Sequence, residues 1–169
     1  MNVLYEKERK YLIDEIDKKD VWEKEHIVYQ WYVEISEGGS IKEKLIFDIL
    51  RNRVIAARIQ KQSLGYGESR KKVEYLDINN FSIEEKMGVP FILKRRSIKQ
   101  NHFLDHFISS NMICEYLLEI EDVQCKDAGF AEYKIVEDVT NDLHYYNQNM
   151  CVPFEKNDAE KLHFLLSIF

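Results

Sequence analysis

The sequence predicts a mainly β fold of the α+β class, an eight-stranded antiparallel β-barrel with flanking helices. About eight segments alternate in character, so that each strand carries a charged face and an apolar face. A sandwich would turn one face of each sheet to water and leave clustered like charges without partners. A closed barrel lets charges from different strands meet in one lumen and places the apolar faces outside, under helices. Because buried unpaired charge is costly, such a lumen should hold both signs of charge and bound ions.

The first predicted strand carries the run E-x-E-x-K, formed by Glu6, Glu8 and Lys10. Residues two apart on a strand share a face, so these three side chains would form a row roughly 13 Å long. Val3, Tyr5, Tyr11 and Ile13 fall on the opposite face and are apolar or aromatic, which supports a strand. An exposed helix with a Glu6–Lys10 pair at i, i+4 is the alternative for this segment taken alone.

Seven further strands are expected from runs of β-branched, aromatic and alternating residues. The 21 Phe, Tyr and Trp residues of the chain favour such a strand-rich structure. Turn signals at residues 37–40, 51–52 and 65–67 separate the first four of these runs. The expected strands are residues 26–35, 41–50, 53–62, 70–78, 91–99, 102–108 and 115–122.

Four helical segments are expected between and after the strands. Residues 14–25 indicate a short polar helix, and a second helical segment is expected near residues 128–137. Residues 82–87 carry a capping signal, with Ser82 as N-cap, Glu85 three residues later and Gly88 as terminator. Residues 157–169 predict an amphipathic helix, because apolar residues recur there at i, i+3, i+4 and i+7.

Length and composition predict one domain that spans residues 1–169. The net charge of −6 argues against general nucleic-acid binding, which depends on a positive field. No apolar run approaches the roughly 20 residues of a membrane span, and the start of the chain is charged rather than signal-like. Three cysteines without C-x-x-C spacing indicate a reduced, cytoplasmic protein. The oligomeric state stays open, a homodimer included.

Several short motifs follow one another along the chain. After E-x-E-x-K come K-x-R (Lys94 and Arg96), D-x-F (Asp105 and Phe107), E-x-E (Glu119 and Glu121) and D-V-T-x-D…Y-x-N (residues 138–147). From residue 4 to about residue 152, this ordered set resembles the CYTH superfamily, also called triphosphate tunnel metalloenzymes. The resemblance implies an eight-stranded barrel whose tunnel binds a linear triphosphate with Mg²⁺ or Mn²⁺. Members include inorganic and thiamine triphosphatases, class IV adenylyl cyclases and some RNA-capping triphosphatases.

The resemblance implies a set of metal-binding carboxylates. Hard cations such as Mg²⁺ take oxygen ligands and keep some waters, so a few carboxylates suffice. Asp138 falls where many family members place a Glu before Val-Thr, and Glu74 matches the second carboxylate of the middle strand. For each residue the alternative role is a surface charge or a structural ion pair. The implied metal ligands are Glu6, Glu8, Glu74, Glu119, Glu121 and Asp138.

The resemblance also implies a set of phosphate-binding cations. Arg suits bidentate contacts with oxygen atoms, and Lys acts as a point charge. The expected R-x-R of the third strand is replaced by Lys42 and Lys44, with Ile46 in place of a further cation; Lys72 could restore that charge. A slip of one residue would turn Lys61 away and bring Arg58 in. The implied substrate-binding residues are Lys10, Lys42, Lys44, Lys61, Lys72, Lys94 and Arg96.

The expected function is metal-dependent hydrolysis of inorganic triphosphate or of a small organic triphosphate. A metal would neutralise the transferred phosphoryl group and orient a water, and Lys10, Glu6 or Glu8 would assist the proton transfer. Two alternatives stay open. One is an adenylyl cyclase of the same fold, which needs a base-binding pocket, and the other is a non-catalytic module that binds polyphosphate or a nucleotide.

Overall fold

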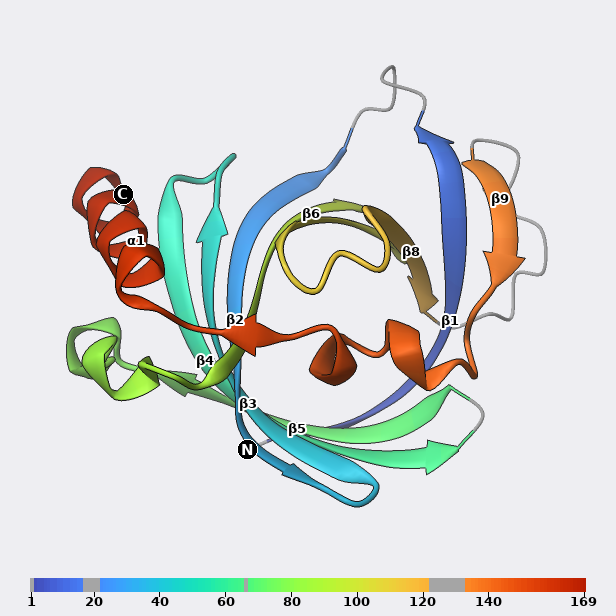
Figure 1. Ribbon diagram of the computed structural model, residues 1–169, viewed down its shortest axis with the longest axis horizontal. Helices are drawn as coiled ribbons and strands as arrows, with labels where there is room; N and C mark the ends of the chain where they lie inside the picture. The colour runs from blue at the N-terminus through green and yellow to red at the C-terminus, as the bar shows by residue number, and fades with distance from the viewer. Residues whose placement is uncertain (1, 17–21, 66, 122–132) are drawn as a thin grey trace.

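The computed structural model describes residues 2–16, 22–65, 67–121 and 133–169, and it consists mainly of β-strands (Figure 1). One α-helix, α1 (Lys156–Ile168), follows the last strand, and short 3-10 turns lie between strands. The strands are β1 (Asn2–Ile16), β2 (Lys24–Ser36), β3 (Gly39–Asp48), β4 (Arg53–Gly65), β5 (Glu68–Leu76), β6 (Pro90–Lys99), β7 (His102–Ser109), β8 (Tyr116–Glu121), β9 (Tyr133–Asp138) and β10 (Val152–Pro153).

Eight of the strands close into the expected antiparallel barrel. The order around the wall is β6-β2-β3-β4-β5-β1-β8-β7, and the pairing of β7 with β6 closes it. Strand β9 lies beside β1 (Figure 1) and pairs with it where β5 has ended. Tyr11 and Leu12 pair with both β8 and β9, so these two strands lie on opposite edges of β1. The predicted barrel is confirmed.

The main hydrophobic core lies outside the barrel, between its wall and α1 (Figure 1). Trp31 of β2 and Phe91 of β6 are fully buried on the outward face, and the Phe154 ring packs against both at centroid distances of 5.3 and 5.0 Å. Leu162 of α1 is fully buried in the same cluster, and Phe169 packs against Phe47 of β3. Alternation on the strands therefore sends the large apolar side chains outward and leaves the inward positions for other residues.

A smaller apolar cluster closes one end of the barrel interior. Ile92, Phe107 and Leu117 lie two positions from charged lumen residues on β6, β7 and β8, so they share the inward face. They pack with Val139 and Met150 from the segment that follows β9. This segment crosses the end of the barrel seen in Figure 1.

Two helices predicted from the sequence are wrong where the structure describes them. Asp14 continues β1, and Lys24 begins β2, so residues 14–25 are no helix; residues 17–21 lie outside the described part. Residues 133–137 form β9, with the buried Tyr133 and the half-buried Ile135 on one face, and residues 128–132 lie outside the described part. These residues form a strand rather than a helix because they pair with the free edge of β1.

Of the other two predicted helices, the C-terminal one is confirmed, whereas residues 82–87 contain only one short turn. Residues 84–86 form a single 3-10 turn, in which the Ser82 hydroxyl accepts a hydrogen bond from the Glu85 amide, and Gly88 ends it at φ +78°. The C-terminal helix covers the expected residues. Within the described ranges, no helix combines the length and apolar character that a membrane span needs.

Candidate functional site

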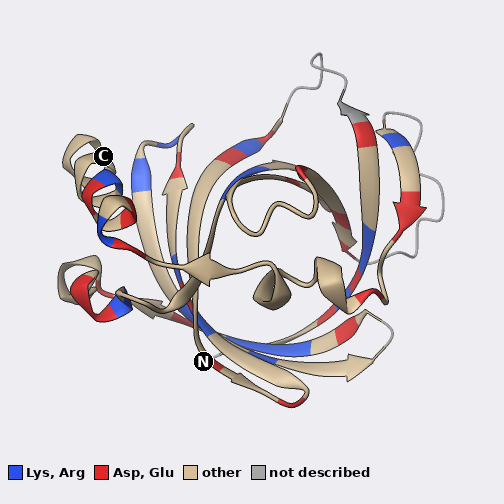
Figure 2. Cartoon of the chain, in the orientation of Figure 1, with Lys and Arg blue, Asp and Glu red and all other residues tan. Residues whose placement is uncertain are grey.

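The barrel encloses a cavity of about 480 Å³. It reaches the β2–β3 hairpin at residues 36–40 and the segment of residues 143–149 at the end of the barrel. Charged side chains from six strands line its wall, and Figure 2 shows basic and acidic residues recurring along these strands. Ten of the predicted site residues line it: Glu6, Glu8, Lys10, Lys42, Lys44, Lys61, Lys94, Arg96, Glu119 and Glu121.

The lumen has an acidic wall and a basic wall. Apart from Glu37 of the β2–β3 turn and Glu68 at the start of β5, the acidic side chains come from three neighbouring strands, β1, β8 and β7. Most basic side chains come from the opposite arc, which runs through β3, β4, β5 and β6, and Lys10 of β1 is the exception. The acidic residues of these three strands are Glu6, Glu8, Asp105, Glu119 and Glu121, and the basic ones of the lumen are Lys10, Lys42, Lys44, Lys61, Lys71, Lys94 and Arg96.

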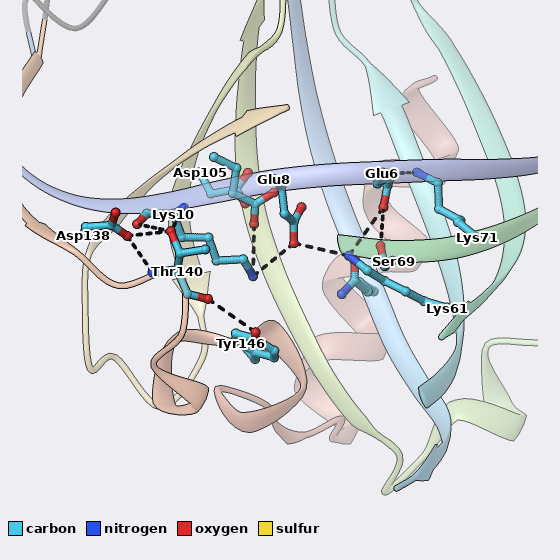
Figure 3. Close-up of polar contacts among 12 residues, drawn as sticks. Glu6, Glu8, Lys10, Lys61, Ser69, Lys71, Asp105, Asp138, Thr140 and Tyr146 are labelled. Carbon is cyan, nitrogen blue, oxygen red and sulfur yellow. Dashed lines mark hydrogen bonds and ion pairs between the residues drawn. The ribbon is translucent and has the colours of Figure 1, made fainter. Parts of the chain in front are cut away.

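The E-x-E-x-K segment forms a strand, as expected, and its carboxylates bind lysines from the opposite wall (Figure 3). Lys61 of β4 lies 3.5 Å from Glu6 and 3.3 Å from Glu8. Lys71 of β5 forms a further ion pair with Glu6, and the Ser69 hydroxyl donates a hydrogen bond to the Glu6 carboxylate. Burial raises the pKa of Glu6, but Lys61 and Lys71 outweigh that effect and lower it to about 2.

Lys10 is fixed from both sides by its neighbours. Its Nζ lies 3.6 Å from Glu8 and 3.8 Å from Glu119, and 4.7 Å from the centre of the Tyr146 ring. Its backbone amide donates to the Thr140 hydroxyl at 3.0 Å, and the Tyr146 hydroxyl donates to the Thr140 carbonyl (Figure 3). The D-V-T motif therefore locks the β1 backbone at the point where Lys10 enters the lumen.

Lys94 and Arg96 are already neutralised by carboxylates of β7 and β8. Asp105 is fully buried and accepts from Lys94 at 2.6 Å and from Arg96 at 2.6 and 2.7 Å. Arg96 also donates to Glu119 at 2.9 Å. Burial would lower the pKa of Arg96, but Asp105 and Glu119 raise it well above its usual value. These four residues form a compact ionic cluster across three strands.

Lys42 and Lys44 of β3 differ from the other lumen cations. Neither forms an ion pair with any carboxylate in the described ranges, although Lys42 is only 8% exposed. Their cross-strand neighbours on β2 and β4 are uncharged, and they are Tyr32, Gln30, Ile59 and Ala57. Burial lowers the pKa of both lysines well below the usual range, and the surrounding cations lower it further. This part of the lumen carries positive charge without an acidic partner.

Three predicted site residues lie away from the cavity. Lys72 and Glu74 of β5 do not line it, because Lys71 is the residue of this strand that faces Glu6, so both were assigned to the wrong face. Asp138 is exposed; it accepts hydrogen bonds from the Thr140 amide and hydroxyl and so supports the turn after β9. The placement of these three residues in the lumen was wrong.

Lys61, in contrast, lies on the predicted face. Arg58, the residue that a shift of the strand by one position would bring into the lumen, instead lies outside the barrel and donates to Glu43 at 2.6 Å. Ile46 shares the face of Lys42 and Lys44, so the expected cation at that position is replaced by an apolar side chain.

Several lumen residues were missed. Lys71 follows Arg70 and precedes Lys72, so the charge pattern alone gives no face, and the small Ser69 opposite Glu6 is the signal that could have identified it. Gln30, a fully buried amide whose Nε2 lies 2.6 Å from the Tyr32 hydroxyl, sits in an apolar run that gives no hint of a cavity. Tyr146 lies one position from the predicted Y-x-N residue Tyr145.

The carboxylates of the acidic wall supply oxygen ligands of the kind that a hard divalent cation prefers. Glu119 Oε1 is buried without a hydrogen-bond donor. Burial raises the pKa of Glu121, and the nearby Glu6 raises it further, so negative charge is crowded here. In the ranges that the structure describes, no three acidic, imidazole or thiol groups converge at metal-binding distance, because Glu6, Glu8 and Glu119 hold lysine or arginine. A cation would replace these partners.

No protein-family model, curated protein or solved structure matches this chain.

Proposed function

We propose that the lumen binds a linear triphosphate, inorganic or small and organic, and hydrolyses it with Mg²⁺ or Mn²⁺. The observation that carries the proposal is the pair Lys42, which is buried, and Lys44, which is half-buried. Neither ammonium group has an acidic partner in the described chain. Keeping such groups charged is costly unless an anion joins them. A bound anion is the partner that this arrangement lacks.

A polyanion suits the lumen better than a single carboxylate or phosphate. Lys42 and Lys44 are two residues apart on one strand, which places their Cα atoms roughly 6.6 Å apart. Lys61 and Lys71 extend the basic wall over the next two strands. A chain of linked phosphates can contact these groups one after another, with each lysine acting as a point charge.

The acidic wall supplies the rest of the proposed chemistry. Glu6, Glu8, Glu119 and Glu121 would hold the metal, which when bound neutralises charge on the transferred phosphoryl group. Lys10 lies between Glu8 and Glu119 and would place its ammonium beside the same group. An acidic wall that faces a basic wall thus separates the metal from the remaining phosphates.

The test is phosphate release from tripolyphosphate, ATP and thiamine triphosphate, with Mg²⁺, with Mn²⁺ and without metal. Metal-dependent turnover of at least one of the three is expected. Absence of turnover with all of them, from protein shown to be folded, would reject the hydrolase. Measurement of cyclic AMP in the ATP reaction would detect a cyclase.

A non-catalytic module that binds polyphosphate or a nucleotide is the second candidate. It is favoured by the ion pairs of Glu6, Glu8 and Glu119, which leave the described lumen without a ready metal cluster. Calorimetry separates the two candidates. Tight binding of tripolyphosphate without product formation would support the module.

A further inference from the structure

Lys61 occupies a position that connects the two walls of the lumen. Its Nζ, on a side chain from β4, lies 3.5 Å from Glu6 and 3.3 Å from Glu8 of β1, and it donates a hydrogen bond to Glu8 (Figure 3). Its side chain is 24% exposed, more than Glu6 at 11% or Glu8 at 12%. One ammonium group thus neutralises both acidic residues of the E-x-E-x-K run.

This contact sets up a competition. The two carboxylates that Lys61 holds belong to the group that fits a divalent cation, and a carboxylate oxygen bound to an ammonium is not free to bind a metal. Lys61 is also part of the basic wall, beside Lys71 and near Lys42. An anion on that wall would attract the same ammonium group away from the acids.

We propose that Lys61 is an exchangeable positioning residue that couples the two ligands. In the ligand-free lumen it is one of the two cations that pair with Glu6 and with Glu8, beside Lys71 and Lys10, and on anion binding it moves to the anion and leaves these carboxylates more open to the metal. The metal and the anion therefore strengthen each other's binding. The inference rests on the proposed anion and metal sites and adds the residue that links them.

Thermodynamic linkage makes this coupling reciprocal. If an anion raises the affinity for metal by some factor, the metal raises the affinity for the anion by the same factor. Removal of the Lys61 charge takes away one competitor of the metal. The ligand-free protein should then bind metal more tightly, and the anion should add less.

The experiment is calorimetry of Mn²⁺ binding, without anion, to the wild type and to Lys61→Met. The variant is expected to bind Mn²⁺ about tenfold more tightly or better, the range for breaking a close charge pair. Lys61→Arg keeps the charge and should keep the wild-type affinity. Lys72→Met removes an outward cation that does not line the lumen, so it should change Mn²⁺ affinity much less.

Sulfate serves as the anion probe, because it binds Mn²⁺ only weakly in solution. Sulfate should tighten Mn²⁺ binding to the wild type, Mn²⁺ should tighten sulfate binding by an equal factor, and Lys61→Met should reduce the effect. The wild-type measurement stands even if Lys61→Met fails to fold.

The outcomes separate the two proposals. Anion binding without any effect on Mn²⁺ affinity, or equal Mn²⁺ affinity of Lys61→Met, Lys72→Met and the wild type, would overturn the role of Lys61 alone. If the wild type binds neither sulfate nor tripolyphosphate, the proposed function itself is overturned.

Discussion

At the scale of single residues, the charge of Lys42 and Lys44 depends on pH in an unusual range. Burial lowers the pKa of both groups well below their ordinary value of 10.5. Between the lowered pKa and 10.5, the unfolded chain binds more protons than the folded protein, so rising pH relieves the cost of burying these charges and increases stability. Anion binding has the opposite dependence, because it needs the charged form.

The affinity for tripolyphosphate should therefore fall with rising pH before ordinary lysines titrate. In Lys42→Arg this fall should shift to higher pH, since a guanidinium stays charged. Calorimetry from pH 7 upward checks this prediction. An affinity that stays constant until about pH 10.5 would contradict a lowered pKa for the lysines that hold the anion.

The residues also show why the lumen-facing side was predictable for β1 and not for β5. On β1, Glu6, Glu8 and Lys10 share one face, and the other face carries Lys7 and Arg9 between Tyr5 and Tyr11. The aromatic residues that flank Lys7 and Arg9 indicate the outer side, so the face of Glu6, Glu8 and Lys10 could be assigned to the lumen. On β5, Arg70, Lys71 and Lys72 place a cation on both faces. Only the pairing of β5 with β1 and β4 decides between the faces, and that pairing is a long-range property of the fold.

At the scale of elements, the cluster around Asp105 joins β6, β7 and β8. Asp105 is fully buried and Lys94 is 1% exposed, so neither charge can be solvated if the other is removed. Asp105→Asn should destabilise the protein by about 3–5 kcal/mol, because it leaves Lys94 and Arg96 underpaired. Denaturant unfolding measures the loss.

The matched control is Glu25→Gln. Glu25 of β2 pairs with Arg95 of β6, which also carries Lys94 and Arg96, but this pair lies at the surface, where an ion pair contributes about 1 kcal/mol or less. Equal losses in the two variants would contradict the structural role of the Asp105 cluster.

Helix α1 stabilises the wall that carries the basic strands. Leu162 is fully buried between α1 and this wall, and Leu162→Ala should cost about 2–5 kcal/mol of unfolding free energy. Phe164 on the same helix is 70% exposed, and Phe164→Ala should stay within about 0.5 kcal/mol. Thermal unfolding of both variants checks the packing, and similar midpoints would contradict it.

The elements that the sequence predicted least well are those that depend on a distant partner. Helix α1 and the hairpin strands follow from local patterns, as their bounds confirm. Strand β9 exists because the end of β1 extends beyond β5 and offers a free edge. The two-residue strand β10 likewise exists because it pairs with Phe91 and Pro90 of β6. No local periodicity signals either pairing.

At the scale of the whole molecule, the barrel separates charge by strand. The acidic strands β1, β8 and β7 are neighbours, and the basic strands lie on the opposite arc, so the field inside runs from one wall to the other. The overall charge of the chain is −6, yet its lumen holds Lys42 and Lys44, which form no ion pair within the described ranges. The fold thus concentrates positive charge in a cavity of an acidic protein, which suits a small anion rather than a nucleic acid.

The most direct measurement is calorimetry of tripolyphosphate binding, without metal, to the wild type, to the double variant Lys42→Met/Lys44→Met and to Lys72→Met. The wild type and Lys72→Met should bind equally, and the double variant should bind about a hundredfold more weakly or worse, because two charge-assisted contacts are lost. A wild type that does not bind, or a double variant that binds as well as the wild type, would contradict an anion site on β3.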